Sequence, residues 1–418
     1  MNILWITNIL FPEVEDLLTG KGELEGSGGW MLGAANGLLA SSGIKLTVAT
    51  VSSKVRQLTR LSGKQISYYI LPLGKGILKK NPEYIPYWQT IQKELQPDVV
   101  HIHGTEFSHG LAYMEACGTK NVLISIQGLT SSCYHYYTAG LSIWEILSSY
   151  TLRDLIKGGI LHGRKLFKQR SNFEREMIKK ARHVIGRTQW DCAHVWAINP
   201  NAKYHFCNEI LRNEFYDGSQ WKHEKCNVHT IFLSQASYPI KGVHMLLKAM
   251  PYVLQHYPDT QIRIGGGNII NKDSFRLTGY AALLKRLIRK TGMQGKIVFT
   301  GPLDAEEMKH EYLKANLFIC PSSIENSSNS LGEAQILGVP CLASYVGGMV
   351  DTMREDAAHL YRFDDVIMLA KKICDVFSAK GKQVDMRKTA KMRHDKETNT
   401  QQLMSIYKLI TEDTCVNI

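Results

Sequence analysis

The sequence contains no run of about 18 uncharged apolar residues, so it predicts no membrane-spanning helix. Even the apolar stretch near residues 141–160 is broken by Glu145, Arg153 and Asp154. Residues 1–7 also lack the basic segment and the long apolar stretch of a signal peptide. We therefore expect the chain to stay in the cytoplasm.

Patterns that bind metal ions are missing as well. No Asp-x-Asp pair occurs, and none of the nine cysteines forms a C-x-x-C motif. An odd number of cysteines in a long chain argues against a disulfide framework or a zinc module. We expect reduced thiols and no essential metal.

The composition excludes a disordered chain and a disulfide-stapled miniprotein, because 44% of the 418 residues are hydrophobic and 21% are charged. At roughly 100–200 residues per domain, this length predicts two domains or three. The net charge of +12 fits nucleic acid, an anionic membrane surface or a phosphorylated small molecule. Composition does not choose among these partners.

Short apolar runs alternate with segments of helical periodicity, which predicts an α/β fold with parallel sheets. One series of strands begins at residues 2–7 and a second at residues 230–236. Asp304 and Glu307 predict a capping box, and Gly338 stands where a helix C-cap glycine belongs. The polar segment 213–227 predicts a linker. We expect domains at residues 1–212 and 228–396, and a C-terminal helix at 397–418 that packs back on the first domain.

The most informative segment is residues 321–334, which follows a predicted strand and enters a predicted helix. Open α/β sheets bind ligands at this edge, and backbone N–H groups at a helix N-terminus suit a phosphate or diphosphate. Glu325 and Glu333 flank small polar residues here. Two structural alternatives stay open: Glu333 in a capping box with Ser330, and Glu325 as a solvated loop acid.

The Glu-x7-Glu element, the Leu-Gly-Val-Pro run at 337–340 and Gly347-Gly348 resemble the donor site of the retaining GT-B glycosyltransferases, glycosyltransferase family 4. Asp351 stands where that family usually has a Glu. Upstream resemblances cover nearly the whole chain and are found at Gly28-Gly29, 98–104, Lys241-Gly242, 265–267 and 299–301.

The resemblance implies a GT-B fold, in which two Rossmann-like domains with parallel sheets face each other across a cleft. It implies that Glu333 holds the ribose and that Glu325, the catalytic residue, contacts the transferred sugar. Ser330 and Leu331 would offer N–H groups to the diphosphate, Lys241 a positive charge, and Gly28 and Gly29 a second wall of the site. A cation and oriented N–H groups stabilise the charge that develops on a leaving diphosphate.

Two departures from the family pattern concern the diphosphate and the acceptor. Ala236 replaces an Arg five residues before the Lys-Gly pair, and Gln127-Gly128 replaces a His-Gly or His-Asp pair. His103, His109 and His135 are alternatives on the acceptor side, with His135 as our candidate. A lone histidine is more often a structural or surface residue.

The segment 153–187 carries 11 Lys and Arg residues and only three acids. Such a run is often a solvated helix face. The functional alternative is a patch for anionic lipid or a polyprenyl-diphosphate acceptor, formed by Arg164, Lys165, Lys168 and Arg170. Nucleic-acid binding is less favoured, because no known nucleic-acid module accompanies the charge.

We therefore expect a metal-independent hexosyltransferase that moves a sugar from a UDP- or GDP-sugar to a hydroxyl of a glycan or lipid-linked glycan. By resemblance it retains the anomeric configuration, needs no other cofactor, and acts in bacterial surface polysaccharide synthesis, in the cytoplasm or on the inner face of the cell membrane. The alternatives are a nucleotide-sugar epimerase of the same fold and a non-catalytic glycan- or membrane-binding module. An NAD enzyme is disfavoured, because no Gly-x-Gly-x-x-Gly follows the first strand.

Overall fold

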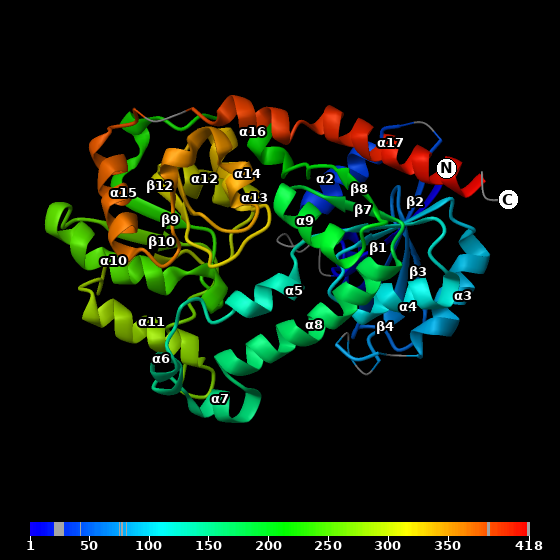
Figure 1. Cartoon of the computed structure of the whole chain (residues 1–418), viewed down its shortest axis with the longest axis horizontal. Coiled ribbons are helices and arrows are strands. Elements are labelled where there is room, and N and C mark those ends of the chain that lie inside the picture. Colours follow the sequence, from blue (N-terminus) through cyan, green and yellow to red (C-terminus); the bar gives the residue numbers. More distant parts are fainter. Residues whose placement is uncertain are drawn as a thin grey trace. The chain divides into compact units, whose positions relative to one another are not determined.

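The computed structural model describes residues 1–418 with the exception of 21–28, 42, 75, 77, 81, 383–384 and 416–418. The chain divides into two units (Figure 1). The first unit comprises Met1–Ser132, Phe167–Ile210 and His394–Ile418, and the second comprises Cys133–Leu166 and Leu211–Arg393.

The first unit is built on an eight-stranded sheet with the order β3-β4-β2-β1-β5-β6-β7-β8. Its neighbouring strands are parallel, apart from β3, which pairs antiparallel with β4. Burial at every position of β5 is typical of a parallel strand covered on both faces. The strands are β1 (Asn2–Ile6), β2 (Lys45–Ser52), β3 (Thr59–Ser62), β4 (Ser67–Pro72), β5 (Val99–His103), β6 (Val122–Ser125), β7 (His183–Gly186) and β8 (Lys203–Phe206).

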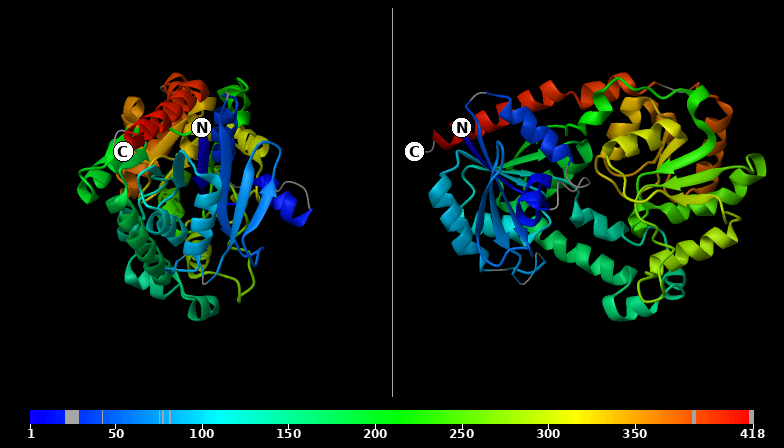
Figure 2. Two further views of the ribbon diagram at one scale, coloured as in Figure 1. Left: turned by 90° about the vertical axis from the view of Figure 1, so that its right-hand side faces the viewer. Right: turned by 180° about the vertical axis from the view of Figure 1, so that it is seen from behind.

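Helices cover both faces of this sheet (Figure 2). Side chains alternate between the two faces along each strand, so each face contributes to a separate core. Leu4 of β1 packs in one core, and its neighbour Trp5 packs in the other. The first core includes α3 (Tyr84–Leu95), α4 (Ser108–Cys117), α9 (Gln189–Ile198) and the end of α8 (Ile160–Lys180). The second includes α1 (Pro12–Thr19), α2 (Gly29–Leu39) and α17 (Lys396–Cys415).

The second unit contains a six-stranded parallel sheet with the order β11-β10-β9-β12-β13-β14. Tyr312 and Leu331 of α12 and α13 pack in a core against Phe318 of β12. The strands are β9 (Asn227–Leu233), β10 (Gln261–Ile264), β11 (Ile297–Phe299), β12 (Ala315–Cys320), β13 (Cys341–Ser344) and β14 (Leu360–Tyr361). The main helices are α10 (Val243–His256), α11 (Gly279–Lys290), α12 (Ala305–Lys314), α13 (Asn329–Leu337), α14 (Met349–Thr352), α15 (Val366–Ser378) and α16 (Arg387–Arg393).

Two predicted helix signals are confirmed. Asp304 accepts a hydrogen bond from the Glu307 N–H, and Glu307 accepts one from the Asp304 N–H, which makes the capping box of α12. Gly338 ends α13 with a φ of 81°.

The division of the chain differs from the predicted domains. Residues 133–166, which we had placed in domain 1–212, belong to the second unit. Part of the predicted linker 213–227 is also structured: Phe215 is buried in the core of the second unit, and the chain changes units after Ile210. Tyr216 and Trp221 of the same segment also pack against this core, and the polarity of the surrounding residues hid these aromatic anchors. The C-terminal residues His394–Ile418 belong to the first unit.

Candidate functional site

The loop between β12 and α13, which carries Glu325, packs closely against the turn that carries Lys241. The Ser323 N–H donates to the Ile240 carbonyl at 2.8 Å. Gly242 follows Lys241 with a φ of 69°, and a Cβ there would lie only 1.7 Å from the Pro321 carbonyl oxygen. Only glycine permits both this backbone conformation and this approach. The Lys-Gly pair therefore positions the lysine against the loop.

Lys241 and Glu325, both predicted from the sequence, form an ion pair with 2.8 Å between Nζ and Oε2. Both side chains are largely buried, with exposures of 18% and 20%. Burial alone would lower the pKa of Lys241, but the adjacent Glu325 carboxylate raises it above its usual value. The lysine is therefore positively charged, and an anion that binds it must compete with Glu325.

The Gly347-Gly348 motif supports the backbone of Glu325. The Gly348 N–H donates to the Glu325 carbonyl at 3.1 Å. A Cβ on Gly347 would lie 2.1 Å from the same carbonyl oxygen. Gly347 and Gly348, which follow β13, thus fix the backbone position of Glu325.

Helix α13 begins with a cap that differs from our expectation. Ser328 is the N-cap, and its Oγ accepts from the Leu331 N–H at 3.3 Å. The predicted Leu331 N–H is therefore already bonded within the helix start. Ser330 lies in the first turn, where its carbonyl accepts from Tyr312 Oη at 2.9 Å.

Glu333 forms a bidentate ion pair with Arg212, with Nε–Oε1 and Nη2–Oε2 distances of 2.8 and 2.9 Å. The carboxylate is buried, and Tyr312 Oη lies 3.4 Å from Oε2. Burial raises the pKa of Glu333, and Arg212 opposes this shift. The capping-box interpretation of Ser330 and Glu333 is therefore wrong, because Ser328 caps the helix and Glu333 binds Arg212.

Sequence reasoning missed Arg212, although it immediately precedes the segment that we took for a linker. Its guanidinium lies over the Phe215 ring at 5.0 Å, so the two residues order this segment together. The sequence did not reveal that Arg212 is the bidentate partner of the buried Glu333 carboxylate, because no local motif predicts such a pair.

The remaining predicted residues lie in different places. Gly28 is outside the described residues, and Gly29 is the first residue of α2. His135 lies in a 3-10 turn (Tyr134–Tyr136) of the second unit. Ser323 Oγ donates to the Tyr136 carbonyl at 2.9 Å, so the turn with His135 lies beside the Glu325 loop.

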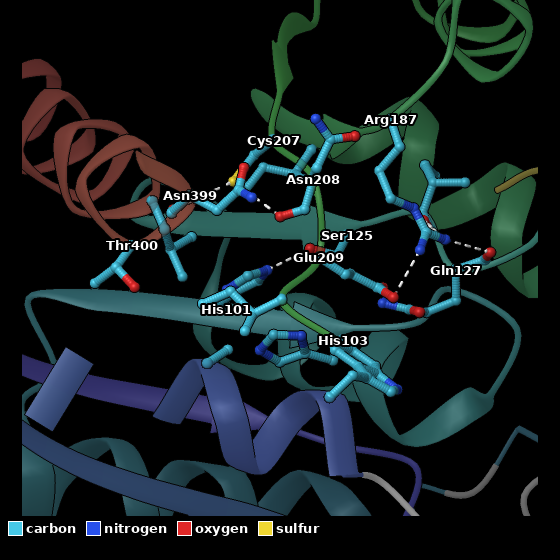
Figure 3. A pocket seen from close by; sticks show the side chains of 16 residues that line it. His101, His103, Ser125, Gln127, Arg187, Cys207, Asn208, Glu209, Asn399 and Thr400 are labelled. Carbon is cyan, nitrogen blue, oxygen red and sulfur yellow. Dashed lines mark hydrogen bonds and ion pairs between the residues drawn. The ribbon is translucent and has the colours of Figure 1, made fainter. Parts of the chain in front are cut away.

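A separate small pocket, partly open to solvent, lies within the first unit (Figure 3). His103 lines it from the end of β5, with only 5% of its surface exposed and with neither ring nitrogen hydrogen-bonded. Burial lowers the pKa of His103 to about 3, so its ring is neutral. The Trp30 ring lies 5.8 Å from the His103 ring and also lines the pocket. The pocket thus combines an unpartnered imidazole with a flat aromatic surface.

Charged and polar groups line another part of this pocket (Figure 3). Arg187, directly after β7, lies 2.7 Å from Glu209 Oε2 and donates to the Gln127 carbonyl at 2.8 Å. These groups converge at the carboxyl ends of β6 and β7, where parallel sheets bind ligands. The position of Arg187 directly after a strand was a signal that sequence reasoning overlooked. No pattern in the sequence marked Glu209 as a functional residue.

The other histidines near this sheet have structural partners. His101 contacts Tyr407 Oη at 2.7 Å and also Ser125 Oγ. His109 bonds the Thr7 carbonyl at 3.1 Å. His103 alone among these three has two buried ring nitrogens without a partner.

The predicted basic patch divides between the two units. Arg164 and Lys165 are exposed in the second unit, and Lys168 is exposed in the first. Arg170 is only partly exposed, and its guanidinium lies 5.1 Å from the centroid of the Phe107 ring. In the described part of the chain, no helix has the length and hydropathy needed to cross a membrane. Those same residues contain no cluster of His, Cys, Asp or Glu that is suited to a metal ion.

Comparisons with known proteins relate part of the chain to glycosyltransferases. Residues 220–393 match the family model of glycosyl transferases group 1, and this segment holds Lys241, Glu325 and Glu333. The chain is 30% identical over 122 residues to the GDP-mannose-dependent alpha-(1-6)-phosphatidylinositol monomannoside mannosyltransferase of Mycolicibacterium smegmatis. That alignment covers 28% of this chain and 29% of the relative.

A second relative is the D-inositol 3-phosphate glycosyltransferase of Corynebacterium urealyticum, which is 26% identical over 178 residues, or 40% of each chain. The matches therefore span well under half of these relatives' length. Among solved structures, sucrose-phosphate synthase from Thermosynechococcus elongatus superposes with a TM-score of 0.69. That superposition covers 98% of this chain and 99% of the synthase at 15% identity.

Proposed function

We propose that this chain, which has the GT-B fold and carries a glycosyl transferases group 1 domain in its second unit, transfers a sugar from a nucleotide donor. The donor is a UDP- or GDP-sugar, and the acceptor is a hydroxyl of a glycan or lipid-linked glycan. We further propose that transfer retains the anomeric configuration, needs no metal ion, and serves bacterial surface polysaccharide synthesis.

The observation that carries this proposal is the charge pair beside the start of α13. Lys241 and Glu325 lie 2.8 Å apart within the family segment, next to a helix N-terminus. A fixed cation and the positive end of a helix both attract a diphosphate. When the diphosphate binds Lys241, the Glu325 carboxylate is freed from its ion pair. It then lies where the sugar attached to that diphosphate must lie.

The chemistry requires little from the protein beyond position and charge. The bond between the anomeric carbon and the diphosphate oxygen breaks, and a bond to the acceptor oxygen forms. The acceptor proton passes to the leaving diphosphate, whose negative charge is stabilised by Lys241 and the start of α13. Glu325 contacts the sugar, while Glu333 binds the ribose and Arg212 orients Glu333.

For the acceptor, the pocket around His103 is better supported than His135. A buried ring with two unsatisfied nitrogens offers both a donor and an acceptor of hydrogen bonds to a sugar hydroxyl. Trp30 adds an apolar ring against which a sugar face can pack. His135 instead packs against the Tyr134 ring, at 3.9 Å.

Thermal-shift measurements with UDP-, GDP- and ADP-sugars test the donor assignment. We expect one nucleotide to raise the melting temperature of the wild type, and Lys241→Gln to abolish that shift. Lys309→Gln is the matched control, because Lys309 is also a buried lysine ion-paired in the second unit, with Asp217 at 2.7 Å. An equal shift in Lys241→Gln, or no shift with any nucleotide, contradicts the proposal.

Product analysis separates the alternatives. A transferase releases nucleoside diphosphate and extends an acceptor, whereas an epimerase releases an altered nucleotide sugar with no acceptor present. A binding module shows the thermal shift without turnover.

A further inference from the structure

Two short helices of the second unit, α6 (Ile143–Leu147) and α7 (Leu152–Lys157), expose most of their large apolar side chains. Trp144, Leu155 and Ile156 are 77%, 72% and 78% exposed. Groups of exposed large apolar side chains often mark a site where a protein or a membrane binds. We call the exposed set the apolar face: Ile143, Trp144, Leu147, Leu152, Leu155 and Ile156.

Both acids of the same segment, Glu145 and Asp154, have partners in the neighbouring helices. Glu145 pairs with Lys248 of α10 at 2.7 Å. Asp154 is buried and accepts from the Gly279 N–H, at the start of α11, at 2.7 Å. Arg286 of α11 donates to the Ser148 carbonyl at 3.1 Å. The segment is therefore anchored on its polar side, and its apolar side faces outward as a built feature of the surface.

The charges next to the apolar face are cationic. From residue 155 to residue 173 the sequence has no acid, and Lys157, Arg164 and Lys165 are exposed there. Helix α11, which contacts α6, also has no acid. Its exposed cations are Lys285, Arg286, Arg289 and Lys290.

This combination favours a lipid surface over a second copy of the chain. In a symmetric dimer the same patch faces itself, so the surrounding cations would repel one another. An anionic bilayer satisfies both features, because its acyl chains accept apolar side chains and its phosphates attract Lys and Arg. Helices as short as α6 and α7 cannot cross a bilayer, but they can lie in its interface, where tryptophan is favoured.

We propose that the apolar face docks on an anionic lipid bilayer, with Trp144, Leu155 and Ile156 inserted below the headgroups. Lys157, Arg164, Lys165 and the cations of α11 contact the lipid phosphates. This site lies outside the donor loop and the His103 pocket, and it requires no assumption about sugar transfer.

Vesicle flotation of the full chain tests the docking site. We expect binding to phosphatidylcholine–phosphatidylglycerol vesicles and weak binding to phosphatidylcholine alone. Combined Trp144→Ser and Ile156→Ser substitutions should lower the partition coefficient at least tenfold, since burial of one large apolar side chain is worth roughly that factor or more. Neutralising Lys157 and Lys165 should cost about fivefold per cation at low salt.

The matched control substitutes the same residue types at other exposed positions. Trp196→Ser with Ile367→Ser, at sites 67% and 56% exposed, should leave binding unchanged. All variants should melt with the wild type, because the substituted side chains are exposed. Brominated lipid should quench tryptophan fluorescence of the wild type more than that of Trp144→Phe.

Three outcomes overturn the proposal. The first is the absence of vesicle binding, and the second is binding that survives Trp144→Ser with Ile156→Ser. The third is sedimentation of a dimer that the same two substitutions dissociate, which assigns the apolar face to a second copy of the chain.

Discussion

The ion pair between Glu333 and Arg212 provides a quantitative test, because Glu333→Gln removes one charge and keeps the shape of the side chain. The wild-type carboxylate accepts two hydrogen bonds from the guanidinium, at 2.8 and 2.9 Å. A glutamine offers one acceptor oxygen and no charge. The substitution therefore leaves Arg212 largely buried without its counterion.

The cost follows from the burial of the pair. Removing one partner of a buried ion pair costs about 3–5 kcal/mol. The Arg212 side chain is 24% exposed and Glu333 only 6%, so we expect a value near the lower limit, about 3 kcal/mol. For a unit of roughly 200 residues, each kcal/mol shifts the melting temperature by about 2–4 °C, which gives a loss of about 6–12 °C.

Thermal denaturation of Glu333→Gln, Arg212→Met and the double variant measures this coupling. The double variant should be less destabilised than the sum of the single variants, because the second substitution removes the uncompensated charge. A Glu333→Gln protein that melts within about 1 °C of the wild type refutes the energetic role assigned to the pair.

The ribose role of Glu333 needs its own readout, since loss of stability is expected in either case. The wild type should bind a nucleoside diphosphate more tightly than its 2′-deoxy analogue, and Glu333→Gln should lose this discrimination. Arg212→Met keeps the carboxylate but removes the group that orients it, so it should retain only part of this discrimination. Equal discrimination in the wild type and Glu333→Gln refutes the ribose assignment.

Three further predictions concern single contacts. Glu325→Gln frees Lys241 from its ion pair, so nucleoside diphosphate should bind about fivefold to tenfold more tightly, while the rate of sugar transfer falls. Calorimetry measures the binding, and weaker binding contradicts this prediction. His103 takes up a proton only near pH 3 in the folded chain but near pH 6.5 when unfolded. Its contribution to stability is therefore complete above pH 6.5 and is lost as the pH falls. At pH 5 the loss is about 2 kcal/mol, and His103→Gln should abolish that part of the pH dependence in denaturant titrations. Tyr407→Phe removes two buried hydrogen bonds, to Trp5 Nε1 and His101 Nδ1, and should lower the unfolding free energy of the first unit by about 1–3 kcal/mol.

The alternation of strands and helices was predictable because the strands of both sheets, apart from β3, run parallel and are largely buried. Such strands appear in the sequence as short apolar runs, as in β12, which is buried at all positions. The N-cap of α12 at Asp304 and the C-cap of α13 at Gly338 were predictable, because the patterns that mark them are local.

The assignment of residues 133–166 to the second unit was not predictable from local patterns. It depends on contacts that join distant parts of the chain, such as His244 Nε2 with the Ala139 carbonyl at 2.8 Å and Glu145 with Lys248. A residue's neighbours in the sequence say nothing of such partners. Composition therefore placed this segment with the residues that precede it.

Within the candidate site, the sequence selected candidate residues but did not predict which contacts they make. Lys241 and Glu325 were both selected, yet only the turn at Gly242 brings them together. Ser328 and Ser330 both suit an N-cap, and the start of α13 at Asn329 decides in favour of Ser328. Helix starts are uncertain by one or two residues from sequence, and that interval separates the two serines.

Both acids of the Glu-x7-Glu element are paired with cations, and this pairing bears on how an anion enters the site. Lys241 balances Glu325, and Arg212 balances Glu333. Burial alone would lower the pKa of Lys241, and the Glu325 carboxylate more than offsets this shift until another anion takes its place. A diphosphate then replaces one anion by another and leaves the charge of Lys241 satisfied throughout. The excess of positive charge lies elsewhere, on residues such as Lys157 and Lys165 beside the apolar face. Salt should therefore weaken vesicle binding more than it weakens nucleotide binding, because exposed cations are screened and the buried pairs are not.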